Sequence, residues 1–559
     1  MGILSLAGKK TRNYSALSRK NKPLRQHRIH PFYRPEEKPT NGNGGKVNFC
    51  YSRQLMPHYA DINAPVNPEA NIKGILEWLA LAHGRSGAED AEQLLRQLRL
   101  LRETPVPCAQ RLKLLDLLYG QSERITKAEL PRLNEVTLPI SRKSRQRVRT
   151  LLDILETLTQ DYFNTLAELF DPQGESSPRL PHTSLRRAMF AIAWQVRISH
   201  MIAAPTPIGL WQQLHAAFRT AQRLGLDEFP GPNCGPSIRR IYTAILLAAI
   251  AQPVSFSADE LEFISEYIDK CTPDIELVTT PPLDAEGIFW IDPERDFPAH
   301  ALIRRIPSPE AEILYFSCDT LAAQAEKHRT ELLQDIPAEL LNLPKFANTH
   351  SGPGVLNRLI QLWGHPAKRR FPRRRQSYRA NLCSGLGNLW RLMKTTDAKV
   401  EQSEWMVTNE SPEGYALMHM SGHTDDIRVG DIVALQATEE RTGSPPLWHI
   451  CIIRWAMSEN PEHIELGLQL LAPKATSVEL AHPFELDASK IPALMLPATP
   501  PLRPNQSLIV PPGTIHENMR RIVVLLEEDN LSIRELQAHK LCEQTSSIEI
   551  FSVSADGSR

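Results

Sequence analysis

The side chains with the clearest chemical potential form a short basic run, KRRFPRRR, which we call the arginine segment (Lys368 to Arg375). A planar guanidinium donates two parallel hydrogen bonds, which suits phosphate oxygens and the Hoogsteen edge of guanine. Between His365 and Arg379 no Asp or Glu offsets this charge, so the segment repels itself until an anion neutralises it. The cations of this stretch are Lys368, Arg369, Arg370, Arg373, Arg374, Arg375 and Arg379.

A second polar signal, NESPEG (Asn409 to Gly414), follows about forty residues later. It lies between the strand-like runs WMVT (405 to 408) and YALM (415 to 418), which predicts a strand-to-strand turn at a barrel rim. Asn409 and Ser411 could hydrogen-bond a base edge there. Gly414 would let a planar ligand approach the backbone without a Cβ in the way.

The order of these two signals resembles the PilZ family of bacterial cyclic di-GMP receptors, whose pattern is RxxxR followed by [D/N]xSxxG on a six-stranded barrel. The resemblance covers residues 368 to about 473, and it continues through the strand-like runs IRVGDIVAL, WHICIIRW and IELGLQLL. It implies that the chain binds cyclic di-GMP and needs no other cofactor. The residues that it assigns to this ligand are Arg369, Arg373, Asn409, Ser411 and Gly414, with Lys368 and Arg370 as auxiliary charges.

The register of the arginine motif is open at the level of sequence. Arg370 with Arg374, and Arg375 with Arg379, satisfy RxxxR as well as Arg369 with Arg373. The stretch GLGNLWRLMKT between the two motifs is expected to form an inserted helix.

Two other interpretations of the same residues stay open. The arginine segment and a basic amino-terminal tail could instead contact nucleic acid, with a steep loss of affinity in salt. Alternatively, the chain is a scaffold with a degenerate barrel, in which the arginine segment is a solvated loop and Asn409 and Ser411 only close an Asx-type turn.

Composition bounds the remaining function classes. Lys plus Arg and Asp plus Glu both number 64, so no global charge attracts nucleic acid or membrane. Scattered cysteines without CxxC pairs, and the lack of a signal peptide or a span long enough for a bilayer, predict a cytoplasmic protein. The sequence has no GxSxG elbow, phosphate-binding GxxxxGK[ST] loop or HExxH helix, so we predict neither an enzyme nor a metal site.

Periodicity and turn residues divide the chain into a multidomain α+β protein. We expect an α-helical region, which would engage a protein partner, then a small α/β unit and a PilZ-like antiparallel β-barrel with extra strands. The predicted divisions are a basic, disordered tail (1–70), a helical domain (71–271), a small α+β unit (272–345), a linker (346–367), the barrel (368–475) and a carboxy-terminal β-unit (476–559).

Overall fold

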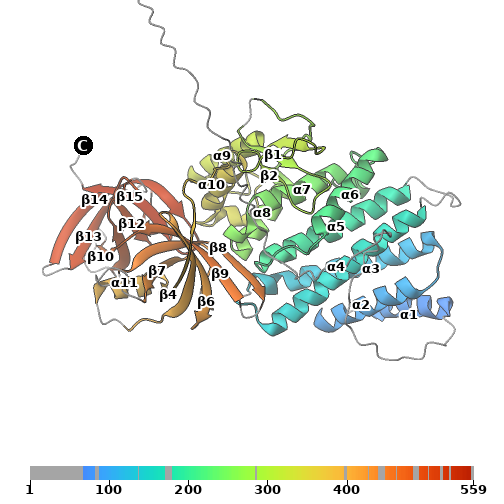
Figure 1. Cartoon of the computed structure of the whole chain (residues 1–559), viewed down its shortest axis with the longest axis horizontal. Helices are drawn as coiled ribbons and strands as arrows, with labels where there is room; N and C mark the ends of the chain where they lie inside the picture. Colours follow the sequence, from blue (N-terminus) through green and yellow to red (C-terminus); the bar gives the residue numbers. More distant parts are fainter. Residues whose placement is uncertain are drawn as a thin grey trace, which may run out of the picture. The chain divides into compact units, whose positions relative to one another are not determined.

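In the computed structural model the chain is helical first and β-rich afterwards (Figure 1). The predicted basic tail lies, up to residue 66, outside the described residues. The residues that the structure describes are 67–81, 87–135, 137–169, 179–283, 286–395, 399–425, 427–438, 447–460, 463–481, 490–500, 503–516, 520–527 and 531–555.

The helical part forms because apolar side chains recur with the period of an α-helix. Leu94 and Leu98 of α2 are fully buried, as are Leu158 and Tyr162 of α4. Within the described residues, no helix has the length and apolarity needed to cross a membrane. The helices are α1 (Pro68–Leu81), α2 (Gly87–Glu103), α3 (Cys108–Asn134), α4 (Arg142–Leu169), α5 (Arg179–Met201), α6 (Leu210–Arg223), α7 (Ile238–Ile250) and α8 (Ala258–Cys271).

A small antiparallel sheet with two helices follows. Its strands β1 (Ile288–Ile291), β2 (His300–Ala301) and β3 (Leu314–Ser317) pair in the order β2-β1-β3. The helices are α9 (Asp319–Leu333) and α10 (Gly352–Trp363). This unit shares one hydrophobic core with α5 to α8, and Trp363 of α10 is fully buried in it. The segment expected to be a linker therefore contains a helix that packs into this core.

The first barrel closes with six strands in the order β4-β5-β6-β9-β8-β7. Helix α11 (Leu386–Lys394) lies between its first two strands, as the sequence predicted, and begins after Gly385, whose φ is positive (84°). The end of the arginine segment belongs to strand β4 and not to a loop. The strands are β4 (Arg374–Ser384), β5 (Ser403–Ser411), β6 (Gly414–Ser421), β7 (Ile432–Ala437), β8 (His449–Asn460) and β9 (His463–Ala472).

The carboxy-terminal strands form a second closed barrel of their own, in the order β10-β11-β12-β15-β14-β13. The predicted fold class, a helical region, a small α/β unit and a barrel with extra strands, is confirmed. These strands close on one another, so they do not complete the first barrel. The strands are β10 (Thr476–Ala481), β11 (Ile491–Leu496), β12 (Ser507–Val510), β13 (Arg521–Glu527), β14 (Leu531–Gln544) and β15 (Glu549–Ala555).

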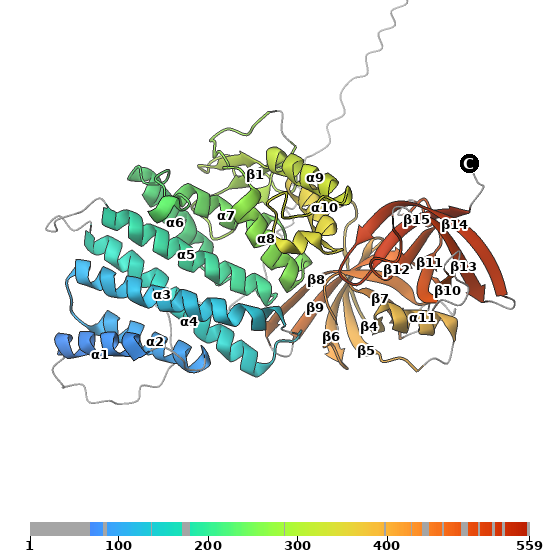
Figure 2. The same ribbon diagram turned by 180° about the vertical axis from the view of Figure 1, so that it is seen from behind.

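The two barrels share a hydrophobic core in addition to the core inside each one. Ile450 and Ile452 of β8 pack in it with Leu494 of β11 and Ile509 of β12. Helix α11 adds Leu389 and, as Figure 2 shows, lies beside strands of both barrels. Burial of these side chains holds the barrels together, because each fully buried aliphatic side chain contributes about 1.5–3 kcal/mol.

A bidentate ion pair joins the barrels outside this apolar contact. Arg454 of β8 donates from Nη1 to Oε1 of Glu543 over 2.9 Å and from Nη2 to Oε2 over 2.6 Å. Burial would raise the pKa of Glu543, but the hydrogen bonds from Arg454 and the charges of Arg454 and Arg358 lower it below its usual range. Glu543 is therefore ionised at neutral pH.

We predict that Arg454 and Glu543 are energetically coupled. In a double-mutant cycle with Arg454→Met and Glu543→Gln, the coupling free energy of unfolding should be about 1–3 kcal/mol, between the values of surface and buried pairs. Because folding lowers the pKa of Glu543, its stabilising contribution should be present above about pH 4 and lost as the pH falls below it. Urea unfolding at several pH values measures both effects.

The control is the more exposed pair Arg379 and Glu404 of the first barrel, in which Nη1 and Oε1 are 3.0 Å apart. A cycle on this pair should give under about 1 kcal/mol. If the two cycles give the same coupling free energy, the pair between the barrels stabilises the fold no more than a surface pair, and the prediction is wrong.

Candidate functional site

The arginine segment is held in place from both ends. It follows α10, and Arg304 of the small α+β unit donates from Nε to the carbonyl oxygen of Ala367 over 2.9 Å. At its other end Arg374 enters β4 and pairs with Glu410 in the register of the sheet. The side chains of Arg369, Arg370 and Arg373 are exposed between these anchors.

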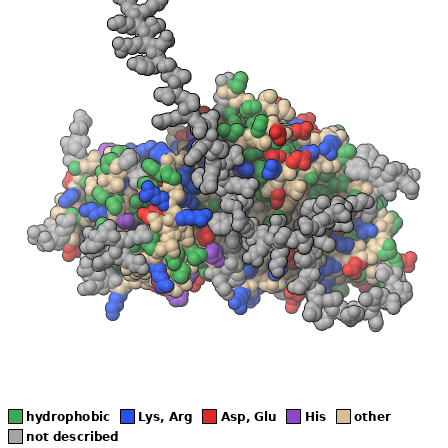
Figure 3. Space-filling model, in the orientation of Figure 1, with side chains coloured by type: hydrophobic (Ala, Val, Ile, Leu, Met, Phe, Trp, Pro, Cys, Tyr) green, Lys and Arg blue, Asp and Glu red, His purple; other side chains and the backbone are tan. Residues whose placement is uncertain are grey.

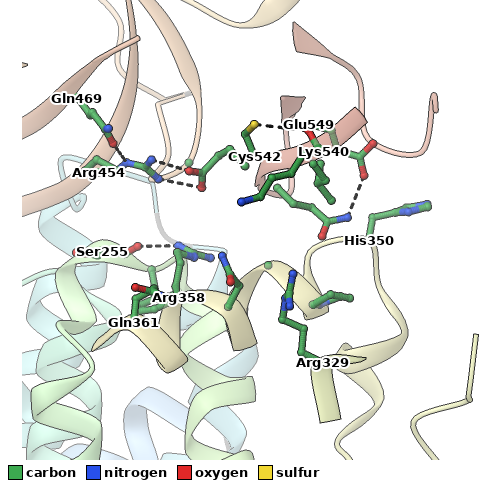
Figure 4. A pocket seen from close by; sticks show the side chains of 18 of the residues that line it. Ser255, Arg329, His350, Arg358, Gln361, Arg454, Gln469, Lys540, Cys542 and Glu549 are labelled. Atoms are coloured by element: carbon green, nitrogen blue, oxygen red, sulfur yellow. Dashed lines mark hydrogen bonds and ion pairs between the residues drawn. The ribbon is translucent and has the colours of Figure 1, made fainter. Parts of the chain in front are cut away.

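A large cavity of about 1700 Å³ lies where the helical part, the first barrel and the second barrel meet. Figure 4 shows side chains from all three parts around it. Of the residues that the sequence assigned to a ligand, five line this cavity, and Lys368 and Asn409 do not. The five are Arg369, Arg370, Arg373, Ser411 and Gly414.

This placement distinguishes the three arginine registers. Arg369 and Arg373 both line the cavity, whereas Arg374 lies outside its lining. Arg379 is also outside the lining and is paired with Glu404. The geometry therefore favours the register Arg369 with Arg373 for a ligand in the cavity.

The cavity side of the segment carries uncompensated positive charge. Burial and the neighbouring charge of Arg369 lower the pKa of Arg373, and the same two causes lower the pKa of Arg304. No acidic partner of Arg369, Arg370 or Arg373 is found in the part of the chain that the structure describes. An anion in the cavity would relieve this repulsion.

Basic side chains do not form one uniform surface elsewhere on the face seen in Figure 3. Lys and Arg residues (blue) are interspersed there with acidic, apolar and uncharged residues.

The NESPEG turn is the tight hairpin between β5 and β6. Ser411 pairs with Gly414 in the ladder, and its Oγ donates to the carbonyl oxygen of Gly414 over 3.3 Å. Asn409 lies within β5, opposite Arg375 of β4 and Ala416 of β6. The motif thus places Ser411 and Gly414 at the cavity, whereas Asn409 lies two residues before Ser411 on β5 and outside the lining.

Gly414 has a structural reason to be glycine. Its φ is 153°, and a Cβ at this position would collide with the carbonyl oxygen of Leu468 on β9. From the sequence we expected the missing Cβ of Gly414 to leave room for a ligand. In the structure, strand β9 occupies the position that this Cβ would take. The glycine allows β6 to pair closely with β9.

The sequence did not predict the other basic residues of the cavity. They come from α9, α10, the first barrel and the second barrel. Except for Arg520, which precedes β13, each belongs to a regular helix or strand, so nothing in the local sequence marks it. Figure 4 labels four of these residues, which are Arg329, Arg358, Arg454 and Lys540.

Three of these four side chains are paired with acids. Arg358 bonds Glu260 of α8 and also donates to the carbonyl oxygen of Ser255 over 3.0 Å, whereas Arg329 pairs with Glu326 within α9. Arg454 bonds Glu543 and donates from Nε to Gln469 of β9 over 2.6 Å. These three arginines lie in the cavity wall, and their charges are already neutralised by their acidic partners.

Residues suited to a metal are not grouped at this site. Within the described residues, no set of three or more His, Cys, Asp or Glu side chains is arranged to hold a metal ion. The chemistry that the cavity offers is recognition of an anion with planar groups by guanidinium, hydroxyl and backbone donors.

Comparisons with known proteins relate this chain to a family of receptors. Residues 73–282 match the family described as cyclic-di-GMP receptor FimW, N-terminal domain, and residues 390–477 match its middle PilZ domain. The second match includes the NESPEG turn and begins after the arginine segment. The cyclic-di-GMP receptor FimW of Pseudomonas aeruginosa is 21% identical to this chain, over 83% of the chain and 88% of that protein. The resemblance to the PilZ family is confirmed.

We predict that Gly414→Ala destabilises the fold by about 1–3 kcal/mol, the usual cost of overpacking, because β9 leaves no space for a Cβ. Thermal unfolding measures the loss. Gly387→Ala in α11 is the matched control, since no atom lies within 4 Å of a Cβ there. This variant should keep or slightly raise stability. A Gly414→Ala protein as stable as the control would refute the structural role.

Proposed function

We propose, from the premise that the first barrel is a PilZ domain, that this protein is a receptor for cyclic di-GMP. The observation that carries the proposal is that Arg369 and Arg373 line one cavity together with Ser411 and Gly414 of the NESPEG turn. Residues 368–475 would bind the dinucleotide, and Lys368, Arg370 and Asn409 would contribute at the edge of the site. The relative FimW, named as a receptor for this ligand, supports the same conclusion.

Energetics support this assignment. A charge-assisted hydrogen bond contributes about 1.5–3 kcal/mol, and micromolar affinity needs about 8 kcal/mol. Two arginines that each make one or two such bonds to phosphate or guanine supply most of this free energy. Binding would also remove the repulsion between Arg369 and Arg373.

The same proposal assigns partner binding to the helical part, residues 71–271. A groove of about 1000 Å³ between α5, α7 and α8 supports this role. Its wall includes the partly exposed rings of Phe190 and Trp194, which are the kind of apolar anchors that protein interfaces use. In this proposal the protein is an effector in the cytoplasm and has no catalytic activity.

We predict that Arg369→Ala and Arg373→Ala each weaken cyclic di-GMP binding about tenfold to hundredfold, the equivalent of one lost charge-assisted contact. Isothermal titration calorimetry at physiological salt measures the effect, with GTP as a ligand that should not bind. Arg379→Ala is the matched control, because Arg379 pairs with Glu404 outside the cavity. Arg374→Ala should change affinity less than about threefold.

Other outcomes would assign the function differently. No heat with the wild-type protein at tens of micromolar ligand would refute the receptor and favour the scaffold. Binding of any polynucleotide, with an affinity that falls steeply as salt rises, would favour the nucleic-acid interpretation. A larger loss in Arg374→Ala than in Arg373→Ala would move the motif to the register Arg370 with Arg374.

A further inference from the structure

The cavity extends from the PilZ domain to the second barrel. Neither the arginine segment nor the NESPEG turn belongs to this second barrel. Residues 538–544 of β14 line it, opposite Arg358 and Gln361 of α10. Figure 4 shows the Lys540 side chain reaching from β14 into the space above α10. The second barrel therefore contributes a cation to the same space as the arginine segment.

The cavity wall between the NESPEG turn and β14 is continuous. Gly414 pairs with Gln469 in the ladder of β6 and β9. The Gln469 side chain accepts from Arg454, whose guanidinium bonds Glu543 of β14. One row of bonded residues thus connects the motif to the strand that carries Lys540.

Charge along the cavity lining is unbalanced. Eight Lys and Arg residues line it against four Asp and Glu residues, but Arg329 and Arg358 are neutralised by Glu326 and Glu260 outside the lining. Glu543 is already bonded to Arg454, and Glu549 accepts from Gln544 and from the backbone of Gly513. Among the described residues no acidic partner of Lys540 is found. Excess positive charge therefore remains in the cavity on the arginine segment and on Lys540.

We propose that the second barrel is part of the ligand site, and that Lys540 is a phosphate-binding residue for the same dinucleotide that the arginine segment holds. This inference rests on the proposed function. A cyclic dinucleotide has two phosphates, and its negative charge would neutralise cations contributed by both barrels. The bound ligand would then hold β14 against the PilZ domain.

Calorimetry on the full chain tests the role of Lys540. Lys540→Gln should weaken cyclic di-GMP binding about tenfold, a loss of about 1.4 kcal/mol. Lys540→Arg, which keeps the charge, should stay within about threefold of wild type. The matched control is Lys490→Gln, because Lys490 lies on the same barrel, pairs with Glu479 and is outside the cavity lining.

Cysteine alkylation followed by mass spectrometry gives a second readout. Cys542 is exposed and lines the cavity two residues from Lys540, whereas Cys234 is exposed in the helical part and outside the lining. Saturating cyclic di-GMP should slow alkylation of Cys542 severalfold and leave the rate at Cys234 unchanged. The comparison within one sample corrects for reagent and folding effects.

The two proposals fail in distinguishable ways. If the wild-type protein binds no ligand, the receptor proposal fails and this inference fails with it. If wild type binds while Lys540→Gln binds equally well and Cys542 is not protected, the receptor stands and the second barrel is not part of the site. An equal loss in Lys490→Gln would show a general charge effect and would also overturn the inference.

Discussion

The contact between the two barrels is the constraint on which the cavity depends. Strands of both barrels and α11 bury one shared apolar layer, which fixes β8 of the PilZ domain close to β14 of the second barrel. Such a layer tolerates little sliding, because its side chains are packed at the density of a protein interior. The walls of the site are therefore held at a set separation before any ligand binds.

Electrostatics divides the basic residues of the cavity into those that the fold neutralises and those that it leaves without an acidic partner among the described residues. Arg358 and Arg454 are each engaged by a buried or half-buried carboxylate, so they support the walls. Arg369 and Arg373 repel one another at the cavity instead. Two groups of basic residues of the same chemical type thus differ in their electrostatic surroundings, according to whether the fold supplies a carboxylate.

Much of this molecule could be predicted from its sequence, because helical periodicity and strand alternation are local signals. Buried Leu94 and Leu98, the inserted helix α11 and the position of the NESPEG turn all follow from such patterns. Strand β14 was harder to recognise, since its pairing with β15 shifts register near Leu541 and breaks the alternation. The contribution of Lys540 depends on two barrels packing together, and no local pattern reports a contact of that kind.

The close approach of β9 to Gly414 affects how this motif can be interpreted in related chains. In Gly414→Ala the new Cβ would collide with the backbone of β9, whether or not a dinucleotide is bound. A barrel that no longer binds a dinucleotide would still need this glycine in order to fold. Retention of the glycine therefore reports an intact barrel. Under the receptor function proposed here, retention of Arg369 and Arg373 would be the sign of ligand binding.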